Sequence, residues 1–249
     1  MERWRGKVAV VTGATAGIGR AIAQRLAQEG LKVVAIGRRA ERLKELAESS
    51  NGKIHAMVCD VTKEEELVNV FKKTEEKLGP VHVLVNNAGT FLPTQVTDGD
   101  IEKWRHMFEL NVLSTGTALR EALKSMKKNG IDDGYIINIS SISSHAIPEG
   151  TGKHIYNATK HALRVITEGA RQELARKKSK IRISTICPGV VDTEIFDVPG
   201  GIGREFLSDK VPRLTSEDIA QNTVDLLRTP PNAHVVDMVV RPLGETLLA

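Results

Sequence analysis

The sequence predicts an α/β fold in which helices cover both faces of a doubly wound parallel sheet of about seven strands. Short runs rich in β-branched residues alternate with longer segments of helical periodicity along nearly the whole chain. These runs lack the alternation of apolar and polar residues that marks a strand with one solvent face. The 249 residues show no internal repeat or linker, so we expect a single domain, with halves at about 1–135 and 136–249.

Each element follows from its local pattern. The predicted strands are 8–11, 32–36, 54–59, 81–86, 135–139, 181–187 and 235–239. The predicted helices are 18–29, 41–49, 63–78, 100–128, 152–177 and 216–228, and we expect the fourth to be broken near Asn111. Residues 192–213 form an irregular stretch rich in glycine and proline. A loop of that length in a compact domain is usually functional, which predicts a lid.

Composition limits the function classes. The net charge of +4 is spread along the chain without a block of five like charges, so a nucleic-acid surface is not required. The two cysteines, Cys59 and Cys187, end apolar runs, and we expect neither a disulfide nor a metal site. The apolar run near the N-terminus is too short for a signal peptide or a membrane span. We therefore expect a cytoplasmic protein.

A glycine-rich turn joins the first strand to the first helix. Gly13, Gly17 and Gly19 have the spacing G-x3-G-x-G, and Thr15 and Ile18 lie in the same turn. Such a turn lets backbone amides at a helix N-terminus approach a pyrophosphate, as in Rossmann-like dinucleotide sites. The alternative is an ordinary strand-to-helix turn without a ligand.

The end of the second strand predicts which dinucleotide is bound. An NAD site usually places an acidic residue here, but this chain has Gly37 followed by Arg38 and Arg39. Guanidinium groups suit a 2′-phosphate, which favours NADP(H), with NAD(H) as the minority alternative. Arg38 is nearer the strand end and is the better candidate. One of the two arginines could instead be a solvated residue at the start of a helix.

Polar residues also follow the third and fourth strands. Asp60 and Val61 could meet the adenine, although Asp60 is equally explained as a turn or helix-cap residue. Asn87 lies in the segment 86–89, whose small residues let a cofactor approach the backbone. The alternative is again an ordinary turn.

Tyr156 and Lys160 lie four residues apart on a predicted helix and therefore share a face. A nearby cation favours the phenolate and lowers the pKa of a tyrosine, which is about 10 in a free side chain. The pair could then exchange a proton with an alcohol or a carbonyl. On its own, the same spacing is more often a solvated surface pair. Ser141 ends an upstream strand in the sequence Asn-Ile-Ser-Ser.

In this order, the motifs resemble the short-chain dehydrogenase/reductase family. The matching segments are 12–19, 60–61, 86–89, 111–112, 139–141, 156–160 and 188–189. Further stretches resemble the dehydrogenase/reductase member-eleven group, which includes NADP-dependent hydroxysteroid reductases and insect farnesol dehydrogenases.

The resemblance implies catalytic roles. Tyr156 would be the general acid/base, and Lys160 would lower its pKa and hold the nicotinamide ribose. Ser141 would hydrogen-bond the substrate oxygen, and Asn111 would hold a water that passes protons from Lys160 to solvent. Ser143 has the spacing from Tyr156 that is commoner in the family, but Ser141 is favoured because it ends the strand.

The resemblance also implies cofactor contacts and an assembly. Asn87 would contact the cofactor backbone or ribose, and Val191 and Thr193 would hold the carboxamide. Ala16 fills a position that is often basic in one NADP-preferring subgroup, so the preference rests on Arg38 and Arg39. The family pairs its long helices across a two-fold axis, which implies a homodimer or homotetramer.

Apolar residues recur where the substrate would enter, and three of them, Ile147, Val190 and Phe196, are the predicted contacts. The wider rim is Ile142, Ala146, Ile195, Val198, Ile202 and Phe206. Such a pocket suits a lipophilic alcohol or ketone, for example farnesol or a steroid, although the same residues could simply pack the lid. The alternatives are a 3-oxoacyl thioester reductase, for which the basic stretch 120–128 would meet a carrier protein, and a non-catalytic dinucleotide sensor.

Overall fold

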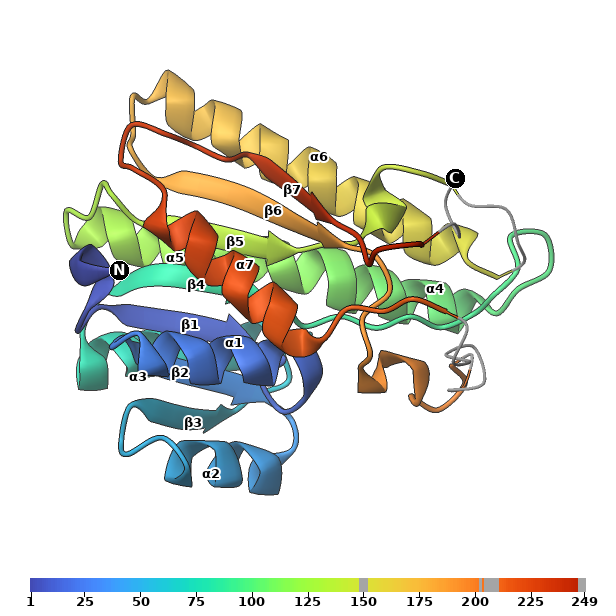
Figure 1. Cartoon of the computed structure of the whole chain (residues 1–249), viewed down its shortest axis with the longest axis horizontal. Coiled ribbons are helices and arrows are strands. Elements are labelled where there is room, and N and C mark those ends of the chain that lie inside the picture. Colours follow the sequence, from blue (N-terminus) through green and yellow to red (C-terminus); the bar gives the residue numbers. More distant parts are fainter. Residues whose placement is uncertain (148–151, 202, 204–210, 246–249) are drawn as a thin grey trace.

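The structure is a computed structural model that describes residues 1–147, 152–201, 203 and 211–245. Seven parallel strands form one sheet in the order β3-β2-β1-β4-β5-β6-β7 (Figure 1). The strands are β1 Val8–Thr12, β2 Lys32–Gly37, β3 Ile54–Val58, β4 Val81–Asn86, β5 Tyr135–Ile139, β6 Arg182–Pro188 and β7 Asp237–Val240. The predicted doubly wound α/β fold is confirmed.

The central strands are buried on both faces, which explains their continuous apolar sequence. Every residue of β1 is buried. Ala9 and Val11 belong to the core on one side of the sheet, whereas Val8 and Val10 belong to the core on the other side. Successive side chains of a strand point to opposite faces, so both faces must be apolar when helices cover both.

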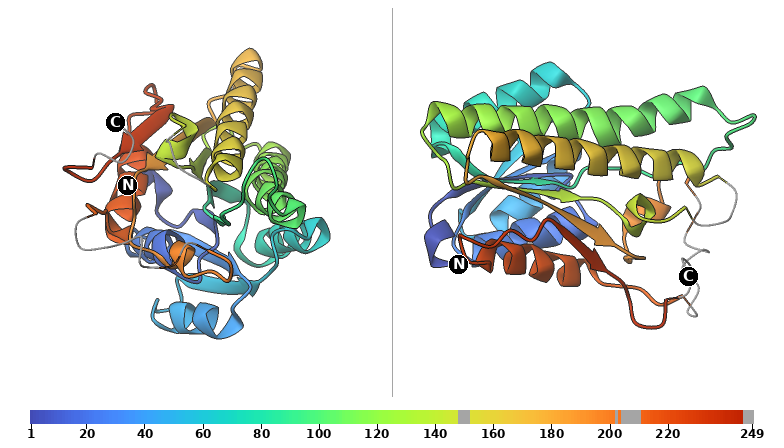
Figure 2. Two further views of the ribbon diagram at one scale, coloured as in Figure 1. Left: turned by 90° about the vertical axis from the view of Figure 1, so that its right-hand side faces the viewer. Right: turned by 90° about the horizontal axis from the view of Figure 1, so that it is seen from above.

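The helices form two layers, one on each side of the sheet (Figure 2). Helix α1 packs against α7 on one side, and α3 packs against α5 on the other. The helices are α1 Gly17–Gln28, α2 Ala40–Glu48, α3 Glu64–Leu78, α4 Ile101–Phe108, α5 Ser114–Lys128, α6 His154–Arg176 and α7 Ser216–Arg228. Helix α7 begins with a capping box in which Thr215 and Asp218 satisfy each other's backbone amides.

The expected break in the fourth predicted helix is a π-helical turn. This turn, η2 Glu109–Leu113, separates α4 from α5 and contains Asn111. π-Helical turns inside longer helices are rare and often lie at functional sites. The turn places Asn111 inside the fold, where 1% of the residue is exposed.

The order of the strands creates a crevice beside β1. Strand β1 pairs with β2 on one side and with β4 on the other, so the chain changes direction across the sheet at this point. Ligands of open α/β sheets bind outside the carboxyl ends of the strands at such a switch point. The glycine turn, Gly37 and Asn86 all lie at this edge.

The sequence also led to expectations about the cysteines, a membrane span and the last strand. Both cysteines are buried and unpaired. No helix in the described part of the chain has the length and apolarity needed to cross a membrane. Strand β7 begins at Asp237 rather than at residue 235.

Candidate active site

A cavity of about 1050 Å³ opens at the carboxyl edge of the sheet. The segments that follow the first six strands line it. It brings together sixteen of the residues predicted from sequence: Gly13, Thr15, Gly17, Ile18, Arg38, Arg39, Asp60, Val61, Asn87, Ser141, Tyr156, Lys160, Val190, Val191, Thr193 and Phe196.

Three predicted site residues do not line this cavity. Gly19 packs against the backbone of Gly13 and the side chain of Asn87, and Asn111 is buried in the protein. Ile147 is 68% exposed and lies outside the lining, so the structure does not place it at the predicted substrate rim. Of the wider rim, Ile142, Ile195 and Val198 line the cavity, whereas Ile202 and Phe206 lie outside the described residues.

The glycine turn is built against the end of β4. A Cβ atom on Gly13 would lie 2.9 Å from the Cα of Ala88, and one on Gly19 would lie 2.3 Å from the Nδ2 of Asn87. That Nδ2 donates hydrogen bonds to the carbonyls of Thr12 at 3.0 Å and Gly13 at 3.2 Å. Asn87 therefore holds the turn in shape, and two of the glycines are required for protein packing as well as for ligand approach.

The N-terminus of α1 faces the same cavity. The residue before the helix, Ala16, offers no side-chain cap, while Gly17 and Ile18 line the cavity. Unsatisfied amides and the helix dipole make such an end favourable for an anion. Gly17 has a φ of +51°, a conformation that favours glycine. These residues fit the pyrophosphate of a dinucleotide.

Positive charge gathers at the end of β2. A Cβ on Gly37 would lie 2.5 Å from the Cγ2 of Thr15, so an acidic side chain cannot stand there unless Thr15 moves. Arg39 donates to the Oγ1 of Thr15 from Nε at 3.0 Å and from Nη2 at 2.7 Å. Arg38 makes no hydrogen bond or ion pair with a described residue, and it lines the cavity.

Asp60 is both a turn residue and part of the cavity wall. Its Oδ1 accepts hydrogen bonds from the backbone N of Thr62 at 3.1 Å and from the Oγ1 of Thr62 at 2.8 Å. Burial would raise the pKa of Asp60, but these hydrogen bonds and the charges of Arg38 and Lys63 outweigh it and lower the pKa. The carboxylate is therefore ionised beside Arg38.

Ser141 and Tyr156 meet at the other end of the cavity. Burial raises the pKa of the Tyr156 phenol to about 12, and its hydrogen bond with the Ser141 side chain partly opposes this. The Oγ of Ser141 also accepts from the backbone N of Ser143 at 3.1 Å. The ring of Phe91 lies 5.1 Å from the Tyr156 ring, measured between centroids. Of the two candidate serines, Ser141 is the one that influences the pKa of the phenol.

Lys160 lies beneath Tyr156. Its Nζ lies 5.6 Å from the centroid of the Tyr156 ring and donates to the carbonyl of Ile139 at 3.2 Å. Burial lowers the pKa of Lys160 to about 8, although Cys187 opposes this. The sequence predicted that Lys160 lowers the pKa of Tyr156. In the chain alone, burial dominates instead, because it disfavours the charged form of both groups.

Asn111 joins three segments through its amide. Its Oδ1 accepts from the backbone N of Thr90 at 2.8 Å, and its Nδ2 donates to the carbonyl of Thr90 at 2.9 Å and to the Oγ1 of Thr159 at 3.1 Å. Thr159 directly precedes Lys160. Asn111 therefore fixes the helix that carries Tyr156 and Lys160 against the segment that follows β4. That it holds a water for proton transfer stays a prediction.

Comparison with known proteins gives the family. Residues 7–198 match the family model described as short chain dehydrogenase. The chain belongs to the short-chain dehydrogenase family.

Known proteins of similar length resemble this chain over nearly its whole length. Farnesol dehydrogenase of Aedes aegypti is 41% identical over 98% of this chain and 99% of its own. Dehydrogenase/reductase SDR family member 11 of Mus musculus is 38% identical over 97% of this chain and 96% of its own. The solved closed form of a serine dehydrogenase complexed with NADP+ is 29% identical, covers 94% of each chain and has a TM-score of 0.86.

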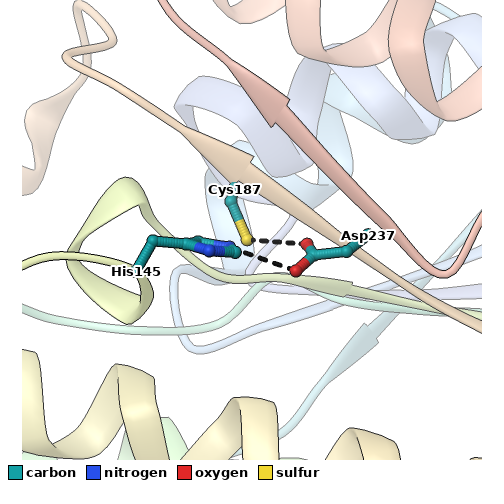
Figure 3. A group of neighbouring side chains, drawn as sticks. All are labelled: His145, Cys187 and Asp237. Atoms are coloured by element: carbon teal, nitrogen blue, oxygen red, sulfur yellow. Dashed lines mark hydrogen bonds and ion pairs between the residues drawn. The ribbon is translucent and has the colours of Figure 1, made fainter.

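His145, Cys187 and Asp237 form a polar cluster (Figure 3). The Nε2 of His145 lies 3.1 Å from one oxygen of Asp237, and the thiol of Cys187 donates to the other at 3.2 Å. Ser144 lies 3.4 Å from the Cys187 sulfur and donates to the carbonyl of Ser141 at 2.7 Å. The cluster thus ties the turn that carries Ser141 to β6 and β7.

These three side chains are of metal-ligating types, and their ligand atoms lie within 4.8 Å of one another. The surroundings suit a polar network better than a cation. Burial raises the pKa of the Cys187 thiol to about 12, which keeps it protonated. The Nε of Arg164 lies 3.6 Å from Asp237 and already supplies positive charge.

Sequence reasoning missed five charged residues that line the cavity: Arg42, Lys153, Glu194, Asp197 and Glu245. Arg42 lies four residues after Arg38, in the first turn of α2, and this closeness in sequence could have revealed it. Glu194 follows the predicted contact Thr193. Glu245 had no signal, because its position depends on tertiary structure: its Oε2 accepts from the Nε of Arg241 at 2.8 Å, and 1% of its side chain is exposed.

Proposed function

We propose that this short-chain dehydrogenase is an NADP(H)-dependent oxidoreductase that interconverts a lipophilic alcohol and its carbonyl. One observation carries the proposal: Ser141, Tyr156 and Lys160 line the same cavity as the arginines that follow β2. A dinucleotide that spans these residues would bring its nicotinamide to the phenol. The hydride chemistry is supplied by that cofactor when it is bound.

The residues of the chain supply proton transfer and orientation. In reduction, Tyr156 donates its phenolic proton to the carbonyl oxygen of the substrate, which becomes the hydroxyl of the alcohol. In oxidation, Tyr156 accepts the proton from that hydroxyl. Ser141 hydrogen-bonds the same oxygen. Lys160 would hold the ribose hydroxyls of the cofactor, and Asn111 positions the helix that carries both Tyr156 and Lys160. Positive charge brought close to the phenol would lower the pKa that burial raises.

Cofactor preference follows from charge. Arg38, Arg39 and Arg42 line one end of the cavity, and Thr15 occupies the space where an acidic residue at position 37 would select NAD. The similar serine dehydrogenase was solved with NADP+. These observations support NADP(H), with NAD(H) as the alternative.

The substrate side of the cavity is mainly apolar. Phe91, Leu92, Val190, Ile195 and Phe196 line it. An apolar pocket with few polar groups suits a lipophilic alcohol, and the similarity to a farnesol dehydrogenase supports an isoprenoid alcohol or a hydroxysteroid. The predicted homodimer or homotetramer and the cytoplasmic location stay predictions.

The basic stretch 120–128 gives little support to the alternative of a thioester reductase that meets a carrier protein. Arg120 forms ion pairs with Glu64 and Glu121, Lys124 with Glu121, and Lys128 with Glu75. Much of its charge is therefore already neutralised by this chain. The further alternative of a non-catalytic sensor is disfavoured because Asn111, Ser141, Tyr156 and Lys160 are all present.

The test is NAD(P)H absorbance kinetics with farnesol, geraniol, a 3-keto steroid, a 17-keto steroid, a diketone and an acetoacetyl thioester. Each is run with the NADP and the NAD forms. We expect turnover of farnesol or a steroid with the NADP form preferred. Turnover of the thioester alone would select the alternative enzyme, and tight cofactor binding without turnover of any compound would contradict the proposed substrate class.

A further inference from the structure

A carboxylate of the chain already occupies part of the arginine cluster that follows β2. Glu194 is the first residue of the short helix η4 Glu194–Phe196. Its Oε2 lies 2.7 Å from the Nη1 of Arg39, and the Nη1 of Arg42 donates to both carboxylate oxygens at 2.7 and 2.8 Å. All three side chains line the cavity. The hydrogen bonds from Arg39 and Arg42 lower the pKa of Glu194, so the carboxylate is ionised.

Glu194 links the two ends of the cavity. The residue before it, Thr193, packs against the glycine turn: a Cβ on Gly17 would lie 3.1 Å from the Cγ2 of Thr193. The residues after it, Ile195 and Phe196, line the substrate side. The ion pairs of Glu194 therefore hold a segment of the substrate side against the site expected to receive the 2′-phosphate.

The ion pairs are weak enough to exchange. Between 41% and 45% of each of the three side chains is exposed, and pairs this exposed contribute little to stability because water and salt screen them. A phosphate dianion carries more charge and more acceptor oxygens than a carboxylate, and guanidinium groups bind it in a bidentate manner. Arg38 makes no hydrogen bond or ion pair with a described residue, so it can contact an entering phosphate at once.

We propose that Glu194 competes with the cofactor's 2′-phosphate for Arg39 and Arg42, and that phosphate binding releases the turn 194–196. Glu194 thus lowers the affinity for NADP(H) but not for NAD(H), and it couples the phosphate end of the cavity to the substrate side. The inference rests on the proposed NADP(H) function and adds a residue that sets cofactor discrimination.

The test compares Glu194→Gln with the parent by equilibrium binding, so no turnover is needed. Fluorescence titration with NADPH and NADH, and competition by adenosine 2′,5′-bisphosphate, give three dissociation constants. We expect the constants for NADPH and the bisphosphate to fall about threefold to tenfold, the equivalent of two weak exposed ion pairs, and that for NADH to stay unchanged. Glu45→Gln is the matched control, because Glu45 is exposed on α2, pairs only loosely with Arg20 at 3.9 Å, and its loss changes net charge equally.

Hydrogen exchange tests the coupling. The bisphosphate reaches only the phosphate end of the cavity, yet we expect it to speed exchange of the amides at 194–199 in the parent and in Glu45→Gln. In Glu194→Gln, exchange there should be fast without any ligand.

Unchanged or weaker NADPH binding by Glu194→Gln would overturn the proposal and make Glu194 a residue that orients the arginines. If the parent binds neither NADPH nor the bisphosphate, the proposed function fails with it, whereas a parent that binds both while Glu194→Gln behaves like Glu45→Gln refutes this inference alone.

Discussion

The Nζ of Lys160 lies 5.6 Å from the centroid of the Tyr156 ring and donates a hydrogen bond to the carbonyl of Ile139. The ammonium thus lies under the ring within the same buried wall as the phenol. Burial lowers the pKa of Lys160 to about 8 and raises that of Tyr156 to about 12. Burial therefore disfavours charge on both groups in the chain alone, relative to the same groups in water.

The burial of Lys160 predicts that its contribution to the free energy of unfolding depends on pH. Its pKa in the folded chain is about 8, below the ordinary value of 10.5, so the unfolded chain binds more protons between these values. The contribution of Lys160 to the free energy of unfolding therefore rises with pH across this window, and the cost of its burial is fully present below about pH 8. The stability of Lys160→Met relative to the parent should consequently fall by about 1–3 kcal/mol from pH 7 to pH 10.

Urea unfolding at pH 7 and pH 10 measures this difference. Lys44→Met is the control, because Lys44 is exposed on α2, and its effect on stability should be the same at both pH values. A relative stability of Lys160→Met that does not change with pH would show that Lys160 keeps an ordinary pKa in the folded chain.

Replacing each of two buried asparagines with leucine should have different effects on the free energy of unfolding. Asn111 is 1% exposed and makes three hydrogen bonds through its amide, whereas Asn157 is 2% exposed and its amide atoms have no hydrogen-bond partner among the described residues. Asn111→Leu leaves buried groups of Thr90 unsatisfied and should cost about 2–4 kcal/mol. Asn157→Leu should be neutral or stabilising by about 1 kcal/mol, because it removes an unsatisfied amide. Equal losses in urea unfolding would mean that Asn157 is hydrogen-bonded through ordered water.

Arg38 should contribute to the binding of NADPH but not to that of NADH, and it should not contribute to the stability of the fold. It makes no hydrogen bond or ion pair with a described residue, so Arg38→Ala should leave the unfolding midpoint unchanged. Loss of one charge-assisted contact to a 2′-phosphate should raise the dissociation constant for NADPH by about tenfold to a hundredfold and leave that for NADH unchanged. Fluorescence titration decides this, with Arg20→Ala as the control. Equal NADPH binding by Arg38→Ala and Arg20→Ala would remove Arg38 from the cofactor site.

The fold could be predicted because its signals are local and strong. The strands around β1 are buried on both faces, so their apolar runs stand out from the amphipathic helices between them. The break near Asn111 was also expected, although a sequence pattern does not give its π-helical form. The glycine turn was predicted from its spacing, but its packing against Asn87 depends on β1 and β4 being neighbours, which no local pattern states.

The parts of the site that escaped prediction depend on side chains brought together by the fold. Glu245 enters the cavity from the last described segment, and Glu194 meets Arg39 and Arg42 across it. The pKa of Tyr156 was misjudged for the same reason: spacing placed Lys160 beside it but gave no measure of burial. Ile147 was expected in the cavity because it is apolar, yet it is 68% exposed.

The chain has two tyrosines, which provide the decisive comparison. Tyr135 lies in β5, buried, with its hydroxyl 2.8 Å from the Oγ of Ser184. Tyr135→Phe should lose about 1 kcal/mol of stability and keep its turnover. Tyr156→Phe should fold and bind NADPH like the parent.

The proposed role of Tyr156 is tested by the turnover of Tyr156→Phe, followed by NADPH absorbance with the best substrate of the panel. If Tyr156 is the acid/base, kcat/KM falls by about 10²–10⁴-fold while the dissociation constant for NADPH stays the same. If Tyr156→Phe turns the substrate over as fast as Tyr135→Phe, the proton comes from another group and the proposed mechanism is wrong.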